Sequence, residues 1–565
     1  MNILYNHLGY SSNAKKVALV QRSTETTNGS FTVYDATERT AVYSGKLTER
    51  KSSWRDWQFW EADFSSVQTE GHYFLVIDGM SPPLVTPSFQ IHTNLYDSQI
   101  ISDLVHYLKS QRCTGIFDLA DSNCPKLGSN ERVDEGVEER VDVHGGWYDA
   151  SGDASKYLSH MSYTNFMNPQ QIPQVVWNLI DGRSRMPEQS VWLDERMVDE
   201  ALHGADFLVR MLDAEGYFYM TVFDRWSKDV SQREICSYTT QQGHKFDTYQ
   251  AGYRQGAGVA IAALARAASL PRNGEFSRVS YLAAAEKGFA HLEQHNRDYL
   301  DDGTENIIDD YCALLAAVEL FSVTRNPDYA KAAEVRAQSL TQRQTAAGWF
   351  WADDAQTRSY FHAAEAGLPY LALMRFMEVM PESTIATTCR TCVELGLKNE
   401  LRMTFDCDVN PFFYPRQYVQ MPGGQGDVRF FIPHENESGY WWQGENARIA
   451  SLASAALAAV SFFAQDAVFC SDLNRYAQTN LDWIFGFNPF DTCMMQGHGR
   501  NNPRYEKGFR NAPGGVCNGI TSGLENEEDI DFRHPADTVP THSWRWTEQW
   551  LLHGLWLFHA LSRKQ

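Results

Sequence analysis

The sequence is poor in basic residues relative to acidic ones. It has 49 Lys and Arg against 71 Asp and Glu, which gives a formal net charge of −22. This charge disfavours nucleic acid and anionic membranes as partners. A membrane-spanning run is also lacking, because the most apolar tract, 449–464, is short and contains several serines, as a buried helix does.

Two features typical of secreted proteins, a signal segment and paired cysteines, are not evident in the sequence. Residues Met1 to His7 lack the basic segment and apolar run of a secretory signal. The ten cysteines show no evident pairing, which is typical of free thiols in a reducing compartment. Cys389 and Cys392 form a C-x-x-C with no second pair to complete a zinc site. We therefore expect a cytoplasmic protein without structural zinc.

The first part of the chain has the pattern of short strands. Seven extended segments, some of them alternating in polarity, are separated by Gly, Pro, Asp and Ser; they are 2–8, 16–21, 31–34, 41–46, 58–64, 73–77 and 88–91. This pattern is typical of an antiparallel β-sandwich of immunoglobulin type. We expect such a domain at 1–92, with a structural role.

The second part, 93–565, has a helical hydrophobic period. Twelve stretches follow it: 97–112, 158–182, 193–213, 250–270, 277–297, 306–325, 327–343, 360–381, 383–402, 444–464, 467–486 and 546–562. No strong strand pattern lies between them. Periodicity alone predicts a large all-α domain joined by loops of very unequal length.

One loop holds the densest group of chemically active residues. The stretch 144–153 reads His-Gly-Gly-Trp-Tyr-Asp-Ala-Ser-Gly-Asp and places Asp149 and Asp153 four residues apart, after Trp147 and Tyr148. Two close carboxylates can hold and deprotonate a water molecule, and flat aromatic rings can stack on sugars. The alternative is structural: Asp153 caps a following helix, and Asp149 lies in a turn.

Two further loops carry candidate sugar-binding residues. Around the loop 403–443, aromatic and acidic side chains are interpreted as a sugar platform: Glu437, Tyr440, Trp441, Trp442 and Glu445. An aromatic plug closing the end of the helical domain is the alternative, but acids would be costly in a dry plug. The loop 487–545 adds His498 and Tyr505 as candidate contacts.

The last helical stretch begins with a tryptophan-rich segment around an acid. Trp544 and Trp546 precede Glu548, and Trp544 is a candidate sugar contact. Apolar neighbours raise the pKa of a carboxyl group because they desolvate its ionised form, which would keep a proton on Glu548. The alternative is a first-turn glutamate favoured by the helix dipole.

The stretch Gly-Gly-Trp-Tyr-Asp-Ala-Ser-Gly-Asp resembles the catalytic-base motif of glycoside hydrolase family nine, in which Gly-Gly-Trp is followed by Asp-Ala-Gly-Asp. The resemblance implies an (α/α)6 barrel behind the immunoglobulin-like domain. It also implies that Asp153 is the general base, Asp149 helps to hold the attacking water, and Glu548 is the general acid. This sequence departs from the family by the inserted Ser151 and lacks the His-x-Arg pair that usually follows the position of Pro503.

The family is inverting, so the resemblance implies single displacement by water without an organic cofactor. Structural calcium occurs in the family, although no acidic loop here has a recognisable ligand pattern. The implied partner is a β-1,4-linked oligosaccharide; the oligomeric state is left open.

The inserted Ser151 and the stretch 440–446 resemble a subgroup of exo-β-D-glucosaminidases that act on chitosan-type oligomers. Acids at 434–445 would then meet the ammonium group of an amino sugar. Two alternatives stay open: a cytoplasmic cellodextrinase or endoglucanase of the same family, and a non-catalytic sugar-binding protein. Retention of all three expected carboxylates argues against the second.

Overall fold

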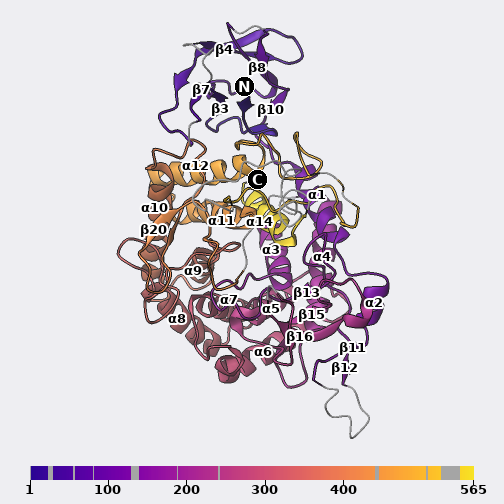
Figure 1. The fold of residues 1–565 in the computed structure, drawn as a ribbon. Helices are drawn as coiled ribbons and strands as arrows, with labels where there is room; N and C mark the ends of the chain where they lie inside the picture. Colours follow the sequence, from indigo (N-terminus) through magenta and orange to yellow (C-terminus); the bar gives the residue numbers. More distant parts are fainter. Residues whose placement is uncertain are drawn as a thin grey trace.

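A computed structural model of the chain shows a β-sandwich stacked on one end of a larger helical domain (Figure 1). It describes residues 2–22, 29–54, 57–79, 82–128, 139–186, 189–239, 242–439, 444–503, 505, 507–523 and 548–564.

The N-terminal domain consists of two packed sheets. Its strands are β1 (Ile3–Leu4), β2 (Gly9–Tyr10), β3 (Val17–Gln21), β4 (Ser30–Asp35), β5 (Ala41–Lys46), β6 (Thr48–Glu49), β7 (Phe59–Asp63), β8 (Gly71–Ile77), β9 (Leu84–Val85) and β10 (Phe89–Ile91). One sheet has the order β1-β3-β7-β6, and the other has the order β2-β10-β8-β4-β5 with β9 beside β8. Alternate residues of β8, namely Tyr73, Leu75 and Ile77, are buried in the core between the sheets, as strand geometry requires. The predicted sandwich is confirmed.

Twelve long helices dominate the described part of the second domain. They are α1 (Ser98–Ser110), α3 (Ile172–Arg185), α4 (Val191–Arg210), α5 (Ala257–Ala267), α6 (Arg278–Tyr299), α7 (Ile307–Thr324), α8 (Pro327–Gln342), α9 (Leu368–Val379), α10 (Ala386–Phe405), α11 (Asn446–Phe462), α12 (Ala467–Ile484) and α14 (Leu551–Ser562). The short α2 (Ile116–Asp121) lies in the loop after α1.

These helices form two concentric rings. The inner ring closes through the neighbours α3, α5, α7, α9, α11 and α14, and α14 packs back on α3. Each of α4, α6, α8, α10, α12 and α1 covers the inner ring from outside. Every residue of α5 is buried and most are alanine or glycine, so neighbouring helices can approach closely. This arrangement is the expected (α/α)6 barrel.

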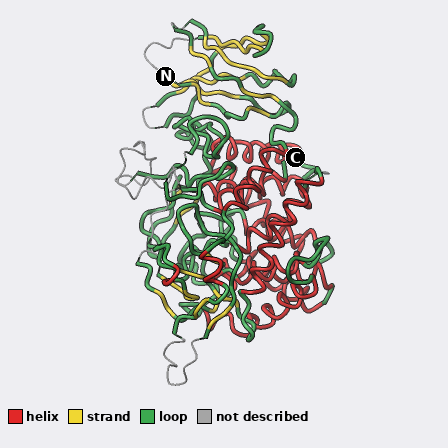
Figure 2. Tube along the Cα trace, turned by 90° about the vertical axis from the view of Figure 1, so that its right-hand side faces the viewer, coloured by secondary structure: helices red, strands yellow, loops and turns green. Residues whose placement is uncertain are grey.

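Buried ion pairs tie together the C-terminal halves of the inner helices. Asp181 of α3 accepts from Arg266 of α5 at 2.8 Å and from Arg563, just after α14, at 2.5 Å. Burial opposes its ionisation, but these arginines hold the pKa of Asp181 well below its usual value. These ion pairs lie at the C-terminal ends of the inner helices. The long loops, which Figure 2 shows on one side of the barrel, lie at the opposite ends of these helices.

Several predicted helices begin later than the hydrophobic period indicates; the stretches 250–270 and 546–562 become helical at Ala257 and Leu551. The stretches 158–182 and 360–381 become helical only at Ile172 and Leu368, and each of these helices has proline in its first turn, Pro173 and Pro369. Proline fits the first helical turn because no intrahelical acceptor awaits its missing N–H. The residues before these helices form loops at the mouth of the barrel.

Small sheets between the helices were not predicted. They contain β11 (Cys124–Pro125), β12 (Arg140–Val141), β13 (Lys156–Tyr157), β14 (Phe218–Tyr219), β15 (Thr221–Phe223), β16 (Glu234–Tyr238), β17 (Lys245–Phe246), β18 (Gln250–Ala251), β19 (Gln417–Val419) and β20 (Asp427–Arg429). Most are two or three residues long, too short to show an alternating pattern. The sheet β13-β15-β16-β17 carries the residues that follow the 144–153 loop.

The two domains share a polar interface. Asn6 donates to Asp482 of α12 at 2.7 Å, and Arg500 donates to the Tyr5 hydroxyl at 2.8 Å. The backbone N–H of His7 also bonds to the Phe485 carbonyl. The predicted boundary between 92 and 93 falls in the connection between β10 and α1.

Candidate active site

The loop at 144–153 is anchored through its aromatic residues. Gly146 has a φ of +71°, and a Cβ there would meet the ring of Phe207, so glycine is required. Trp147 is fully buried and its indole N–H donates to Glu200 at 3.3 Å. Tyr148 is 1% exposed, and the Arg510 guanidinium lies over its ring. The predicted sugar-stacking roles of Trp147 and Tyr148 are therefore wrong, because both rings are already packed in the protein.

Backbone pairing joins this loop to the segment that carries Glu548. The Ser151 N–H donates to the Gln549 carbonyl, and the Leu551 N–H donates to the Asp149 carbonyl. On the other side of the segment that carries Glu548, the Glu548 carbonyl accepts a hydrogen bond from the Asn518 N–H. The predicted acid and base segments, about 400 residues apart in sequence, therefore lie on adjacent extended strands.

Asp153 is held by three donors. One carboxylate oxygen accepts from the backbone N–H groups of Ala154 and Ser155 at 2.6 and 2.9 Å. The other accepts from the Tyr157 hydroxyl at 2.9 Å. The structural alternative, a helix cap, is wrong, since Ala154 begins no helix and leads into β13. The three donors fix the orientation of this carboxylate.

Asp149 lies in a less polar environment. It is 4% exposed and accepts a hydrogen bond from the Gln171 side chain, at the start of α3. His160 Nδ1 is 3.6 Å from its second oxygen, too far for a hydrogen bond. Burial, together with the charges of Asp153 and Glu548, raises the pKa of Asp149 well above its usual value. Burial also lowers the pKa of His160 to about 3, so the imidazole is neutral and leaves this carboxyl uncompensated.

Replacing Asp149 by Asn should therefore stabilise the fold at neutral pH. The pKa of Asp149 is higher in the folded than in the unfolded chain. The contribution of Asp149 to the free energy of unfolding is therefore complete below the ordinary pKa of aspartate, and it is lost as the pH rises through the raised pKa. We expect Asp149→Asn to gain on the order of 1–2 kcal/mol in unfolding free energy at pH 8 and little at pH 4. Urea unfolding at both pH values measures this. A variant less stable than the wild type at pH 8 would contradict the burial argument.

Glu548 lies directly over the loop. A Cβ on Gly152 would come within 2.6 Å of its Oε1 and 2.7 Å of the Phe509 ring, so any other residue here would displace the acid or this ring. Burial, reinforced by the negative charge of Asp153, raises the pKa of Glu548 to about 7. A carboxyl group with this pKa still carries a proton near neutral pH, as a general acid must.

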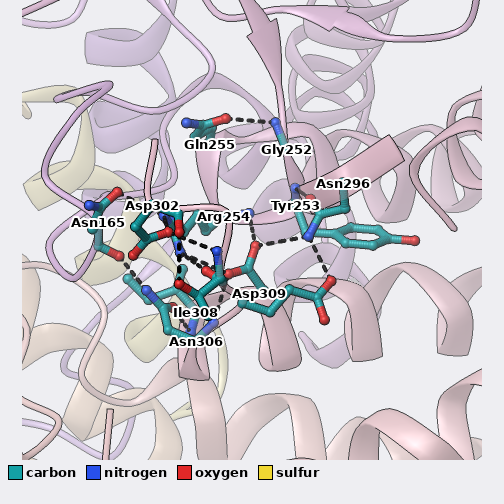
Figure 3. A network of polar contacts seen from close by, with 12 residues as sticks. Asn165, Gly252, Tyr253, Arg254, Gln255, Asn296, Asp302, Asn306, Ile308 and Asp309 are labelled. Atoms are coloured by element: carbon teal, nitrogen blue, oxygen red, sulfur yellow. Dashed lines mark hydrogen bonds and ion pairs between the residues drawn. The ribbon is translucent and has the colours of Figure 1, made fainter. Parts of the chain in front are cut away.

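A polar network positions the segment that carries Gln171. Figure 3 shows Arg254, from the turn before α5, reaching Asn165 at 2.7 Å and Asp302 at 2.9 Å. Asp309 of α7 accepts from the Arg254 N–H and from the Asn306 N–H in a capping box. This capping role is the structural one that first-turn acids favour. Through Asn165 the network holds the loop 160–171, and with it the partner of Asp149.

The acids of the predicted sugar platform have arginine partners. Glu437 forms a two-point pair with Arg358, whose Nη2 is 3.0 Å from it. Glu445 is 2% exposed and accepts from Arg448 at 2.7 Å and from the Tyr414 hydroxyl at 2.9 Å. The predicted substrate contact of Glu445 is therefore wrong, since its oxygens are satisfied inside the barrel. Glu437 remains partly accessible, but its charge is already paired.

The other predicted contacts have different outcomes. Tyr440, Trp441, Trp442 and Trp544 lie outside the described residues. His498 pairs through Nε2 with Asp103 of the outer helix α1 at 2.8 Å, which occupies this nitrogen. Tyr505 is 71% exposed, and its predicted role stays a prediction.

The described residues contain neither a metal-binding cluster nor a membrane-spanning helix. No group of three or more His, Cys, Asp and Glu side chains there is arranged to hold a metal ion. Likewise, none of the described helices is both long and apolar enough to cross a bilayer. Calcium binding stays untested.

Sequence reasoning missed several residues that shape the site: Tyr157, His160, Gln171, Gln549 and Trp550. Tyr157 lies four residues after Asp153, so a local search for partners would have found it. Gln171 is 22 residues from Asp149 and has no distinguishing pattern. Only the fold brings it to the carboxyl group.

Comparison with known proteins finds family matches for both parts of the chain. Residues 98–507 match the family described as glycosyl hydrolase family 9, and residues 1–81 match the cellulase N-terminal ig-like domain. A xyloglucan-specific endo-β-1,4-glucanase of Bacteroides ovatus, BoGH9A, is 26% identical over 331 residues, which are 54% of this chain. The match spans about half of that relative's length, 52%.

Solved structures show the same fold over the whole chain. A family 9 protein of Bacteroides ovatus has a TM-score of 0.68 at 19% identity, covering 100% of this chain and 98% of its own. A metagenome-derived family 9 endoglucanase has a TM-score of 0.70 at 18% identity, with the same coverage. With a family match over most of its length and both domains in the expected order, the chain belongs to glycosyl hydrolase family 9.

Proposed function

We propose that the protein hydrolyses β-1,4-glycosidic bonds of short oligosaccharides with inversion of configuration. One observation carries this proposal: the backbone pairing that places Glu548 beside the segment from Asp149 to Asp153. The family match and the endoglucanase names of similar proteins support the same reaction class. The three carboxyl groups argue against the purely sugar-binding alternative.

In this mechanism Glu548 gives its proton to the glycosidic oxygen as the bond to the anomeric carbon breaks. Asp153 takes a proton from a water molecule that attacks the opposite face of that carbon. Asp149 holds the same water from its buried position. We assign the base role to Asp153 because three donors fix the orientation of its carboxylate, whereas in the described residues Asp149 accepts from the Gln171 amide alone. Inversion requires carboxyl groups ~6.5–9.5 Å apart, which leaves room for the water.

For the substrate we propose exo-acting removal of glucosamine from chitosan-type oligomers. The acids at 434–445 no longer support this idea, because Glu437 and Glu445 are paired with arginines. Support comes instead from the catalytic carboxyl groups and Asp224. The pKa of buried Asp224 is raised by desolvation and by the charge of Asp153. Such a concentration of acidic groups favours a cationic amino sugar.

The burial of the reacting aspartates motivates the exo mode. Asp149 and Asp153 are only 4% and 6% exposed, so a substrate reaches them only between the surrounding loops. The second candidate is cleavage within a β-1,4-glucan, favoured by the endoglucanases among the similar proteins. The cytoplasmic location expected from the cysteines stays a prediction, and cell fractionation tests it.

Product analysis on tetramers of glucosamine and glucose decides between these candidates. We expect glucosamine monomer and trimer first, with the monomer released as the α-anomer in proton NMR, and slower cleavage of cellotetraose. Early dimer release would contradict the exo mode. Faster cleavage of cellotetraose would assign the protein to the glucan-cleaving group.

The pH profile should show the titration of Glu548. The acid must be protonated, and its pKa is about 7, so kcat/KM should fall about tenfold per pH unit above that value. Initial rates on glucosamine dimer between pH 5 and pH 9 measure this. A rate that stays constant to pH 9 would contradict Glu548 as the acid.

A further inference from the structure

A second cavity lies between the two domains, away from the catalytic loop. Its volume is about 490 Å³. One wall comes from the β-sandwich, including Lys15 and Arg50, and the other from α12 and Phe413 of the barrel. We call this the interdomain pocket. Sites of a few hundred Å³ suit monosaccharide-sized ligands.

The pocket has an excess of positive charge. The guanidiniums of Arg50 and Arg475 lie 4.2 and 4.6 Å from the centre of the same Phe413 ring, and Arg475 also stacks on Phe405 at 4.2 Å. Stacking holds both guanidiniums in place, and Arg50 also donates to Glu61 and to the Pro411 carbonyl at 2.8 Å. Phe413 itself has a φ of +55°, a strained conformation for a non-glycine residue.

Two acids, Glu61 and Asp482, lie at the pocket, and they neutralise only part of the charge of its four cations, Lys15, Arg50, Arg475 and Lys564. Glu61 is shared by Arg50 and Lys15, whose Nζ is 3.6 Å from it. Within the described residues, no carboxylate lies within ion-pair distance of Arg475. Burial and the charge of Arg50 lower the pKa of Arg475, so the two cations repel each other and a bound anion would relieve that repulsion. This concentration of cations occurs in a protein with a net charge of −22.

Polar side chains line another part of the same pocket, and some already bond to protein groups, since Asp482 accepts from Asn6 at 2.7 Å and from Gln478. Gln478, Thr479 and Asp482 all come from the last turns of α12. Lys564 also lines the pocket and contacts Gln478. Phe487 adds an apolar surface. A ligand that combines one anionic group with several hydroxyls would match both regions, whereas a neutral sugar would leave the cations unused.

We propose that the interdomain pocket binds a phosphorylated monosaccharide, with its phosphate on Arg50, Arg475 and Lys15 and its hydroxyls toward α12. Arginine pairs recognise phosphate with charge-assisted hydrogen bonds that are stronger than neutral ones. Such binding would join the two domains and is separate from hydrolysis at Glu548.

Titration calorimetry of the full chain with glucose 6-phosphate tests this proposal. We expect saturable binding at one site, at least tenfold weaker binding of inorganic phosphate, and no heat with glucose. Arg475→Gln should weaken binding by roughly 10–100-fold, as loss of a charge-assisted hydrogen bond predicts. Arg297→Gln, at an exposed position outside the pocket, is the matched control and should bind as the wild type does.

Two further variants keep the test decisive. Lys15→Gln changes a half-exposed side chain and should also weaken binding, so a folding defect in Arg475→Gln does not end the test. Glu548→Gln should bind as tightly as the wild type, which separates this pocket from the catalytic site. Absence of binding, equal affinity for phosphate alone, or full affinity in both pocket variants would overturn the proposal.

Discussion

Asp153→Asn should reduce hydrolysis by about 10²–10⁴-fold, because every substrate needs the attacking water to lose a proton. The loss should be as large for aryl glycosides with good leaving groups as for natural dimers. An amide keeps the size of the side chain and can still accept from the Ala154 and Ser155 N–H groups. The fold should therefore persist, and initial rates on both substrate types measure the effect.

A matched control and a direct comparison sharpen this result. Asp229→Asn changes an exposed aspartate that caps the short helix Val230–Gln232 and should leave the rate unchanged. Asp149→Asn should also be severely impaired if both carboxyl groups hold the water. If Asp149→Asn were inactive while Asp153→Asn kept its activity, the residue inserted between them would have exchanged their roles.

Glu548→Gln should lose roughly 10²–10⁴-fold in kcat on natural oligosaccharides, since an amide cannot protonate the glycosidic oxygen. The loss should be much smaller for dinitrophenyl glycosides, whose leaving group departs without a proton. The decline in rate above pH 7 should disappear with this variant, because the titrating group is gone. Rates on the two substrates from pH 5 to pH 9 measure all three effects.

Glu234→Gln is the matched control, because Glu234 lies in β16 and pairs with Lys245 at 2.8 Å. It should keep both the rate and the pH profile of the wild type. Near wild-type turnover of a natural dimer by Glu548→Gln would remove Glu548 from the mechanism. An equal loss on both substrates would indicate a general disturbance of the site.

The repetitive parts of the fold were predictable because their causes are local. Alternating burial in β8 reflects a period of two residues that is visible in the sequence, and the almost entirely apolar run of α5 indicates a helix that is buried on all sides. The starts of α3 and α9 were not predictable from periodicity, because apolar loop residues precede their first-turn prolines. The short sheets near the site offered too few residues for any pattern.

The sequence alone determined the types of the reacting groups: two aspartates four residues apart, and a glutamate before the last helix. Tertiary structure decided their neighbours. Ser151 pairs with Gln549 across nearly 400 residues, Trp147 is buried against Glu200, and Glu445 is neutralised by Arg448. The physical reason is that a side chain's availability depends on burial and on the charges that folding brings near it, and neither is recorded in the spacing of residues.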